Sequence, residues 1–148
     1  MPDAYCVELT MADKIRLRVV TPSRLVLDEE VDEVTAPGEL GEFGVLPNHI
    51  AFLSTLVPGE LSYKQGSDRV ILAISGGYAE VLDNVMTVLA PAAEFAWEID
   101  MARAQRARER AEKQLSELNR EESDWETAEA AMKLAQVRVQ VASREARR

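Results

Sequence analysis

Hydrophobic and polar residues alternate in short runs along the first two thirds of the chain. The first such run alternates three basic residues with Ile15, Leu17 and Val19. One face of this segment is therefore expected to be buried and the other exposed to solvent. Further short strands are expected at 25–27, 31–35, 45–46, 52–56, 61–63, 69–74, 78–82 and 85–89. Many short strands at close spacing predict an antiparallel sandwich or barrel, and we expect a β-sandwich of about ten strands.

The last third of the chain changes to the spacing of amphipathic helices. Small and apolar residues recur at 104, 107, 111, 115 and 118, and again at 125, 128, 132, 135, 139 and 142. The pattern breaks at 119–124, and so short a connection makes the two helices antiparallel neighbours. Alanine is the commonest residue on the two helix faces that meet, so each contact between the helices buries little apolar area. We therefore expect a two-helix hairpin that folds locally but docks weakly.

Composition divides the chain near residues 91–100. All seven glycines and all six prolines precede Phe95, and residues 1–100 hold 6 basic and 17 acidic residues, against 11 and 9 in residues 101–148. The fold class is mainly β followed by α. We expect an extension or leader at 1–10, a β-sandwich at 11–93 and an α-helical hairpin at 94–148. Cys6 falls in the first segment, where we expect a bystander thiol.

Charge and residue counts exclude several classes of function. The formal net charge of −9 disfavours nucleic acid and anionic lipid as partners. One cysteine and one histidine leave no cluster with zinc spacing, so no metal site is expected. The longest uncharged run, 43–59, contains two prolines, so direct membrane insertion is not expected. No glycine-rich loop precedes Lys-Ser or Lys-Thr, which excludes a Walker-type phosphate cradle.

The chain is not expected to carry an active site of its own. His49 stands alone in a proline-bounded loop without an evident nucleophile, and we interpret it as a turn residue that hydrogen-bonds to the backbone. The acidic run at 28–30 is interpreted as a solvated turn. These residues favour a binding or structural protein over an enzyme.

Two segments combine residue types in a more specific way. The first is the loop Gly41-Glu42-Phe43-Gly44-Val45-Leu46-Pro47-Asn48-His49, for which the plain alternative is a tight turn with a bulge. The second is Ile99-Asp100-Met101-Ala102-Arg103-Ala104, where the Asp100 carboxylate can cap the helix. Arg103 and Arg110 are seven residues apart and share a helix face, either for binding or simply solvated and paired with neighbouring acids.

With these segments the chain resembles the epsilon subunits of bacterial F-type ATP synthases. That family carries a Gly-Glu-Leu-Gly-Ile-Leu-Pro-Gly-His-Ala-Pro loop, Ser-Gly-Gly-Phe-x-Glu-Val and Val-Thr-Val-Leu-Ala strands, and Ile/Leu-Asp-x-x-Arg-Ala at a helix start. The corresponding segments here, in the same order, are 41–49, 75–81, 86–90 and 99–104. Asn48 replaces the usual glycine, and Ile50-Ala51 replaces Ala-Pro.

The resemblance implies a non-catalytic rotor subunit in the central stalk of a proton-transporting ATP synthase, peripheral on the cytoplasmic face of the bacterial inner membrane. It implies a sandwich that binds the gamma subunit and sits on the c-ring, coupling proton-driven rotation to ATP synthesis elsewhere in the complex. The contact loop carried over comprises Gly41, Glu42, Phe43, Gly44 and His49. An acidic segment framed by glycines can approach a partner backbone closely.

The resemblance also implies two positions of the hairpin. It packs against the sandwich, or it extends along gamma, contacts an acidic segment of a catalytic beta subunit and blocks ATP hydrolysis. The basic residues assigned to that contact are Arg106, Arg108, Lys113, Arg120, Lys133 and Arg144. Several such pairs must act together, because one exposed pair contributes little. The alternative is that these charges only keep the hairpin soluble.

In some bacterial relatives the compact hairpin binds ATP, although no cofactor is required. The residues carried over are Glu94, Asp100, Arg103, Ala104, Arg110 and Arg138. Arginine suits a polyphosphate because its planar fork can donate two parallel hydrogen bonds. The ATP-binding pattern has a further arginine one turn before Arg138, where this chain has Leu134. The resemblance therefore implies at most a weak, regulatory ATP site.

Two other interpretations stay open. The chain could be a free ATP-binding sensor that uses the same hairpin, or an unrelated sandwich with a coiled-coil interaction arm. Co-purification separates them, because a rotor subunit is found with a large membrane complex and a sensor is found alone with nucleotide. The 41–49 segment favours the rotor subunit over the free sensor, since nucleotide sensing does not require a loop that contacts the c-ring.

Overall fold

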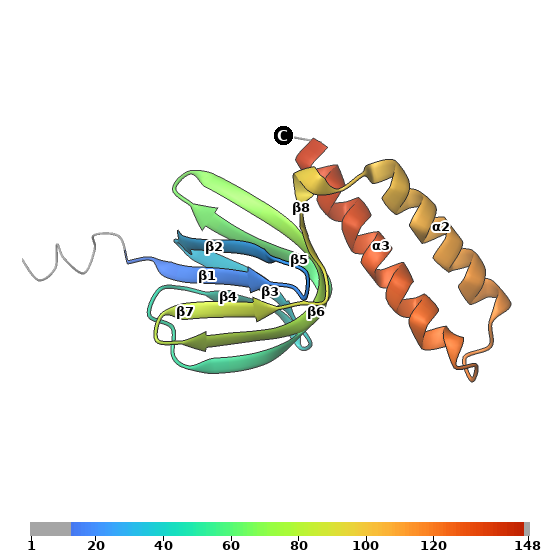
Figure 1. Ribbon diagram of the computed structural model, residues 1–148, viewed down its shortest axis with the longest axis horizontal. Coiled ribbons are helices and arrows are strands. Elements are labelled where there is room, and N and C mark those ends of the chain that lie inside the picture. The colour runs from blue at the N-terminus through green and yellow to red at the C-terminus, as the bar shows by residue number, and fades with distance from the viewer. Residues whose placement is uncertain (1–12, 147–148) are drawn as a thin grey trace, which may run out of the picture.

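A computed structural model describes residues 13–146, so the predicted leader at 1–10 and Cys6 lie outside the described residues. A strand-rich body is followed by two antiparallel helices on its flank (Figure 1). The strands are β1 (Ile15–Val20), β2 (Leu25–Val31), β3 (Glu33–Gly38), β4 (Gly41–Val45), β5 (Phe52–Gln65), β6 (Asp68–Leu82), β7 (Val85–Leu89) and β8 (Ala93–Phe95). A 3₁₀ turn, η1 (Ala96–Glu98), leads to the helices α2 (Met101–Glu117) and α3 (Asp124–Ala146).

Seven strands form one continuous path in the order β2-β1-β7-β6-β5-β3-β4, and β8 pairs with β6 off this path. The sheet folds over on itself, so its inner faces enclose a common core (Figure 1). The predicted antiparallel arrangement holds for every described pair except β1 and β7, which run parallel. The direction of β1 relative to β7 is not dictated by a hairpin turn, because the two strands lie far apart in the sequence.

Residues 13–146 form eight strands rather than about ten, because two pairs of predicted strands are continuous. Pro58-Gly59 and Gly76-Gly77 look like breaks in the sequence, yet β5 and β6 pass through them as one long, curved hairpin (Figure 1). Pro58 lies opposite Ser75 in this ladder. Gly76 and Gly77 have φ values of 108° and 114°, which L side chains rarely adopt. The glycine pair therefore bends the strand without ending it.

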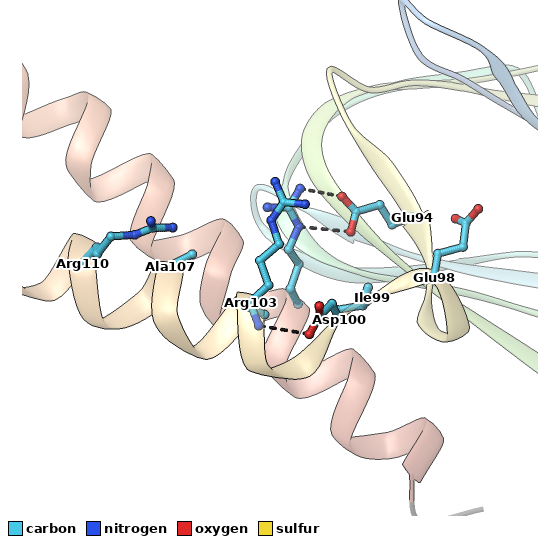
Figure 2. A pocket seen from close by; sticks show the side chains of 9 residues that line it. Glu94, Glu98, Ile99, Asp100, Arg103, Ala107 and Arg110 are labelled. Atoms are coloured by element: carbon cyan, nitrogen blue, oxygen red, sulfur yellow. Dashed lines mark hydrogen bonds and ion pairs between the residues drawn. The ribbon is translucent and has the colours of Figure 1, made fainter.

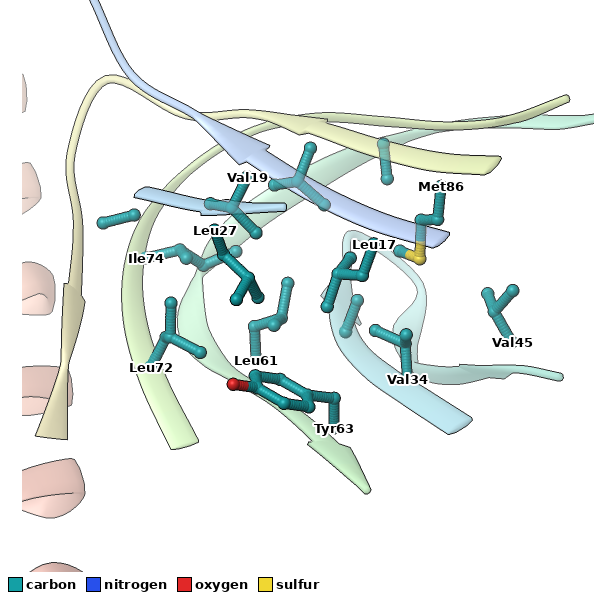
Figure 3. Packing of buried hydrophobic residues seen from close by; sticks show 14 of the residues in the cluster. Leu17, Val19, Leu27, Val34, Val45, Leu61, Tyr63, Leu72, Ile74 and Met86 are labelled. Carbon is teal, nitrogen blue, oxygen red and sulfur yellow. The ribbon is translucent and has the colours of Figure 1, made fainter. Parts of the chain in front are cut away.

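Alternating residues of the strands fill the interior of the sandwich (Figure 3). Leu17, Val19, Leu61, Leu72 and Ile74 are completely buried. Full burial of one such side chain stabilises the fold by about 1.5–3 kcal/mol. The expected inward face of the first strand is confirmed, since Ile15, Leu17 and Val19 are all buried while its basic residues face outward.

A second, smaller cluster holds α3 against the outer face of the sandwich. Ile71 and Ala73 of β6 pack with Ala96, Val137 and Val141. The predicted inner face of the second helix is only part of its buried surface: Ala128, Ala135 and Ala142 are buried as expected, while Val137 and Val141 make the contact with the sheet. Only three of these five clustered side chains are larger than alanine, so this docking contact is modest.

Candidate functional site

The segment 41–49, predicted as one loop, consists of a strand and a separate turn. Gly41–Val45 is β4, an edge strand that pairs with β3, and Gly38 lies opposite Gly41 where the two strands are joined. This correction has a simple cause, since two glycines weaken strand propensity in the sequence but do not prevent backbone pairing. Leu40 at the β3–β4 turn is fully exposed, and Glu42 and Gly44 are exposed along the edge.

The turn at the other end of β4 explains why asparagine replaces glycine at position 48. The backbone N–H of His49 donates to the carbonyl of Leu46 over 3.2 Å, closing a four-residue turn around Pro47 and Asn48. Asn48 has a φ of 63°. Proline followed by a residue of positive φ is typical of a type II turn, and asparagine tolerates that conformation better than other non-glycine residues.

Phe52 connects the two predicted contact residues Phe43 and His49. Its ring centroid lies 5.3 Å from that of Phe43 and 5.7 Å from that of His49, both in edge-to-face geometry. His49 Nδ1 lies 2.8 Å from the carbonyl oxygen of Ile50, in keeping with its interpretation as a turn residue bound to backbone. Gly41, beside the β3–β4 turn, lines one shallow hollow together with Phe43 and Phe52.

An exposed, largely apolar face on β5, β6 and β7 was not predicted from the sequence. Tyr78 lies opposite Leu89, and Leu82 lies opposite Val85, while the intervening Ala79 and Val81 point into the core. Half or more of the surface of each large side chain of this face is exposed, and these are Leu53, Tyr78, Leu82 and Leu89. Both faces of β6 are largely apolar, so alternation could not indicate which face was exposed.

The six residues assigned to a nucleotide surround one cavity of about 360 Å³ between η1, α2 and α3 (Figure 2). The Asp100 carboxylate accepts a hydrogen bond from the backbone N–H of Arg103 over 3.2 Å, confirming the predicted helix cap. Arg138 donates two hydrogen bonds to Glu94, at 3.2 and 2.6 Å. Within residues 13–146, Arg103 and Arg110 form no ion pair. The cavity therefore contains two guanidinium groups that an anion could engage.

On the sandwich side of the cavity, Glu98 is held by a residue that the sequence analysis did not single out. Arg24, in the β1–β2 turn, donates to both carboxylate oxygens of Glu98, at 3.0 and 2.9 Å. The backbone N–H of Phe95 donates to the same carboxylate over 2.9 Å. The hydrogen bonds from Arg24 are the main reason that the pKa of Glu98 is lowered. Only the folded chain could reveal this pair, because 74 residues separate its members.

This lowered pKa predicts a specific acid sensitivity. A carboxyl whose pKa falls on folding stabilises the chain above its ordinary pKa, here 4.5, and that contribution is lost as pH falls through the lower folded pKa. We expect Arg24→Gln to lose less stability than the native chain between about pH 6 and pH 3. Urea denaturation at both pH values measures this. Arg106→Gln, which removes an exposed arginine elsewhere, should behave like the native chain; equal behaviour of all three would contradict the prediction.

The six basic residues assigned to a beta subunit do not form one cluster. Arg108 and Lys133 lie 3.7 and 3.6 Å from acids one turn away on their own helices. Arg120 lies over the ring of Trp125, and Arg144 contacts Glu60 of the sandwich at 2.6 Å. For Arg106 and Lys113 the described part of the chain offers no ion pair. The docked hairpin thus spreads this charge over several faces.

Between residues 13 and 146, no group of three or more histidine, cysteine or acidic side chains is arranged to hold a metal ion. In the same range, no helix is long and apolar enough to cross a membrane.

Comparisons with known proteins place the chain in a family. Two family models match it: "ATP synthase, Delta/Epsilon chain, beta-sandwich domain" over residues 14–96, and "ATP synthase, Delta/Epsilon chain, long alpha-helix domain" over residues 98–143. The ATP synthase epsilon chain of Syntrophobacter fumaroxidans is 54% identical over 134 residues, which are 90% of this chain and 99% of the relative. That of Geobacter sulfurreducens is 49% identical over 138 residues, covering 93% of this chain and 100% of the relative.

Among solved structures, a chain of the Euglena gracilis mitochondrial ATP synthase, in a complex described as OSCP/F1/c-ring, is 25% identical with a TM-score of 0.74. The match covers 94% of this chain and 84% of that chain. Both domains, their order and nearly the full length of the sequence relatives are therefore shared. The chain belongs to the Delta/Epsilon family of ATP synthase subunits, as an epsilon subunit of the F-type enzyme.

Proposed function

We propose that this chain is a non-catalytic rotor subunit in the central stalk of a bacterial F-type ATP synthase, peripheral on the cytoplasmic face of the inner membrane. In this role it binds the gamma subunit and the c-ring and couples proton-driven rotation to ATP synthesis elsewhere in the complex. Family membership supports this role, as does the similarity to a chain of an F1/c-ring assembly.

The exposed apolar face of β5, β6 and β7 is the observation that carries the proposal. Several large exposed apolar side chains on one face of a small protein mark a site of protein association, and here Glu80 lies among them, opposite Leu53. Leu53, Tyr78 and Leu89 of this face are assigned to the gamma subunit. The residues assigned to the c-ring are those of the β4 edge and the adjoining turn, namely Gly41, Glu42, Phe43, Gly44 and His49.

The hairpin is proposed to restrain ATP hydrolysis when it leaves the sandwich. Its docking contact consists of a small apolar cluster and two ion pairs, Arg138–Glu94 and Arg144–Glu60. The Arg144–Glu60 pair is exposed and contributes little, and the Arg138–Glu94 pair is only partly buried, so the docked position can be exchanged for another partner. Undocking separates Arg144 from Glu60, so that Arg144 and the other basic residues of the hairpin can face the acidic segment of a catalytic beta subunit.

Truncation after Glu98 tests the two roles separately. The shortened chain keeps β8, the apolar core and the Arg24–Glu98 pair, and loses both helices. ATPase activity of a catalytic head depleted of this subunit is titrated with the full and the shortened chain. We expect both to bind and only the full chain to inhibit.

The other outcomes of this titration are equally informative. If both chains bind and neither inhibits, the rotor role stands and the restraining role of the hairpin is wrong. If neither chain binds, the rotor role itself fails. A free ATP-binding sensor then becomes the better proposal, and purification of the chain alone with bound nucleotide would support it.

A second role, as a sensor of ATP within the complex, is favoured by the cavity at the base of the hairpin. Its walls combine Arg103 and Arg110 with Arg138, which is already engaged by Glu94. Because η1 forms one wall of this cavity, the complete cavity exists only when the hairpin is docked, and a polyphosphate that binds there favours the docked hairpin. Because Leu134 replaces a further arginine, we propose a weak regulatory site. Calorimetric titration of the chain with ATP measures this binding directly.

A further inference from the structure

We infer that Asn84, in the β6–β7 turn, is a positioning residue that fixes the ring-facing turn relative to the exposed apolar face; this inference rests on the proposed function. The side-chain oxygen of Asn84 accepts a hydrogen bond from the backbone N–H of Asn48 over 2.8 Å. Its side-chain nitrogen donates to the carbonyl of Lys14 over 2.7 Å. Its own carbonyl accepts from the backbone N–H of Arg16 over 3.2 Å. One residue thus connects three segments that are distant in the sequence.

The chemistry of this position selects asparagine. The side chain must accept one hydrogen bond and donate another at the same time, which an aspartate carboxylate cannot do. The backbone of Asn84 also has a φ of 60°, a conformation that asparagine tolerates better than most residues. A second contact supports the same junction, because the side-chain nitrogen of Asn48 donates to Asp13 over 3.1 Å.

The segments joined by Asn84 carry exposed apolar side chains. Leu46 and Ile50 flank the turn that Asn84 holds through Asn48, and both are exposed. Leu82, two residues before Asn84, is part of the exposed face of β5, β6 and β7. The proposed ring contact and the proposed gamma contact therefore meet at this residue. A subunit that transmits torque needs these two surfaces in a fixed relative position, and the Asn84 side chain supplies a direct connection.

Replacement of Asn84 by glycine tests this role. Glycine adopts the same positive φ without strain and removes both side-chain hydrogen bonds. Asp83→Gly is the matched control: Asp83 precedes Asn84 in the same turn, has a φ of 49°, and its side chain forms no hydrogen bond among residues 13–146.

Two measurements are needed. The first is amide hydrogen exchange at position 48 in the isolated full chain, which we expect to be about fivefold faster in Asn84→Gly and unchanged in Asp83→Gly. The second is ATP-driven proton pumping relative to ATP hydrolysis, in membranes depleted of this subunit and supplied with each variant. We expect Asn84→Gly to lose coupled pumping while it remains folded at the assay temperature, and Asp83→Gly to retain coupled pumping.

The outcomes separate this inference from the proposed function. If the native chain restores coupling and Asn84→Gly restores it equally well, Asn84 has no positioning role. If the native chain itself restores nothing, the proposed function fails and the inference falls with it. Should Asn84→Gly prove unfolded, Asn84→Asp takes its place, since it keeps the acceptor for Asn48 and loses only the donor to Lys14. Full coupling in Asn84→Asp, which lacks the hydrogen bond to Lys14, would then overturn the inference.

Discussion

Replacement of Gly77 by alanine is expected to lower the free energy of unfolding by at least about 3 kcal/mol. An ideal Cβ at this position lies 1.9 Å from the carbonyl oxygen of Leu89, a backbone atom of the neighbouring strand. Contact at that distance forces β7 to move. The φ of 114° adds strain of its own, because L residues rarely adopt it. The result is a loss of stability without removal of any side chain from the core.

Gly66→Ala is the matched control for this substitution. Gly66 also has a positive φ, 65°, but nothing lies within 4 Å of the position its Cβ would occupy. The control therefore carries the conformational cost of about 1–2 kcal/mol without the clash. Urea denaturation followed by circular dichroism measures both variants. Equal losses of stability in the two variants would show that β7 can move away from the added Cβ without destabilising the fold. The close approach of Leu89 to Gly77 would then not be structurally important.

The same glycine shows why the strands were only partly predictable. Alternation located the apolar and polar faces of the first strand, because its exposed side is strongly basic. At Gly76-Gly77 the local signal indicates an interruption, and only the partner strands reveal that pairing continues through it. The parallel pairing of β1 with β7 also depends on tertiary structure, since each strand by itself is compatible with either direction.

The residues of the candidate sites were likewise only partly predictable from the sequence. The six residues carried over from family motifs line one cavity although they span 94 to 138, because the helix start and the second helix both face η1. Arg24 and Asn84 could not be assigned from the sequence, since each acts through a partner at least 36 residues away. Val137 and Val141 carried a weak signal at a spacing of four, which the stronger alanine pattern of the same helix obscured.

Substitution of Leu134 by arginine is expected to tighten ATP binding about ten- to hundredfold, because a hydrogen bond to a charged group contributes roughly 1.5–3 kcal/mol. Leu134 lies one helical turn before Arg138, and both line a groove of about 620 Å³ between α2 and α3. Arg110 lines this groove and also the adjoining cavity at η1. An arginine at 134 would thus add a third guanidinium group to Arg103 and Arg110, free of the acid that engages Arg138.

Isothermal titration calorimetry of the full chain with ATP measures the change. We expect the native chain to bind with a dissociation constant weaker than about 10 μM. Leu134→Gln is the control, since it gives the position a polar side chain without the charge and should leave the affinity near the native value. A dissociation constant of the native chain below about 10 μM would show that Leu134 does not weaken ATP binding. Unchanged affinity in Leu134→Arg would place ATP elsewhere, or nowhere, on the hairpin.

The consequence for regulation follows from mass action. A ligand that binds only the docked hairpin stabilises it by about 0.4 kcal/mol when its concentration equals the dissociation constant, and by about 2.7 kcal/mol at a hundredfold excess. The docking contact is a small apolar cluster with two ion pairs, so a gain of that size is enough to hold the hairpin on the sandwich. In the ATPase titration, Leu134→Arg should therefore inhibit less than the native chain when ATP is abundant. Inhibition that is equally insensitive to ATP in both chains, despite tighter binding, would separate the cavity from control of the hairpin.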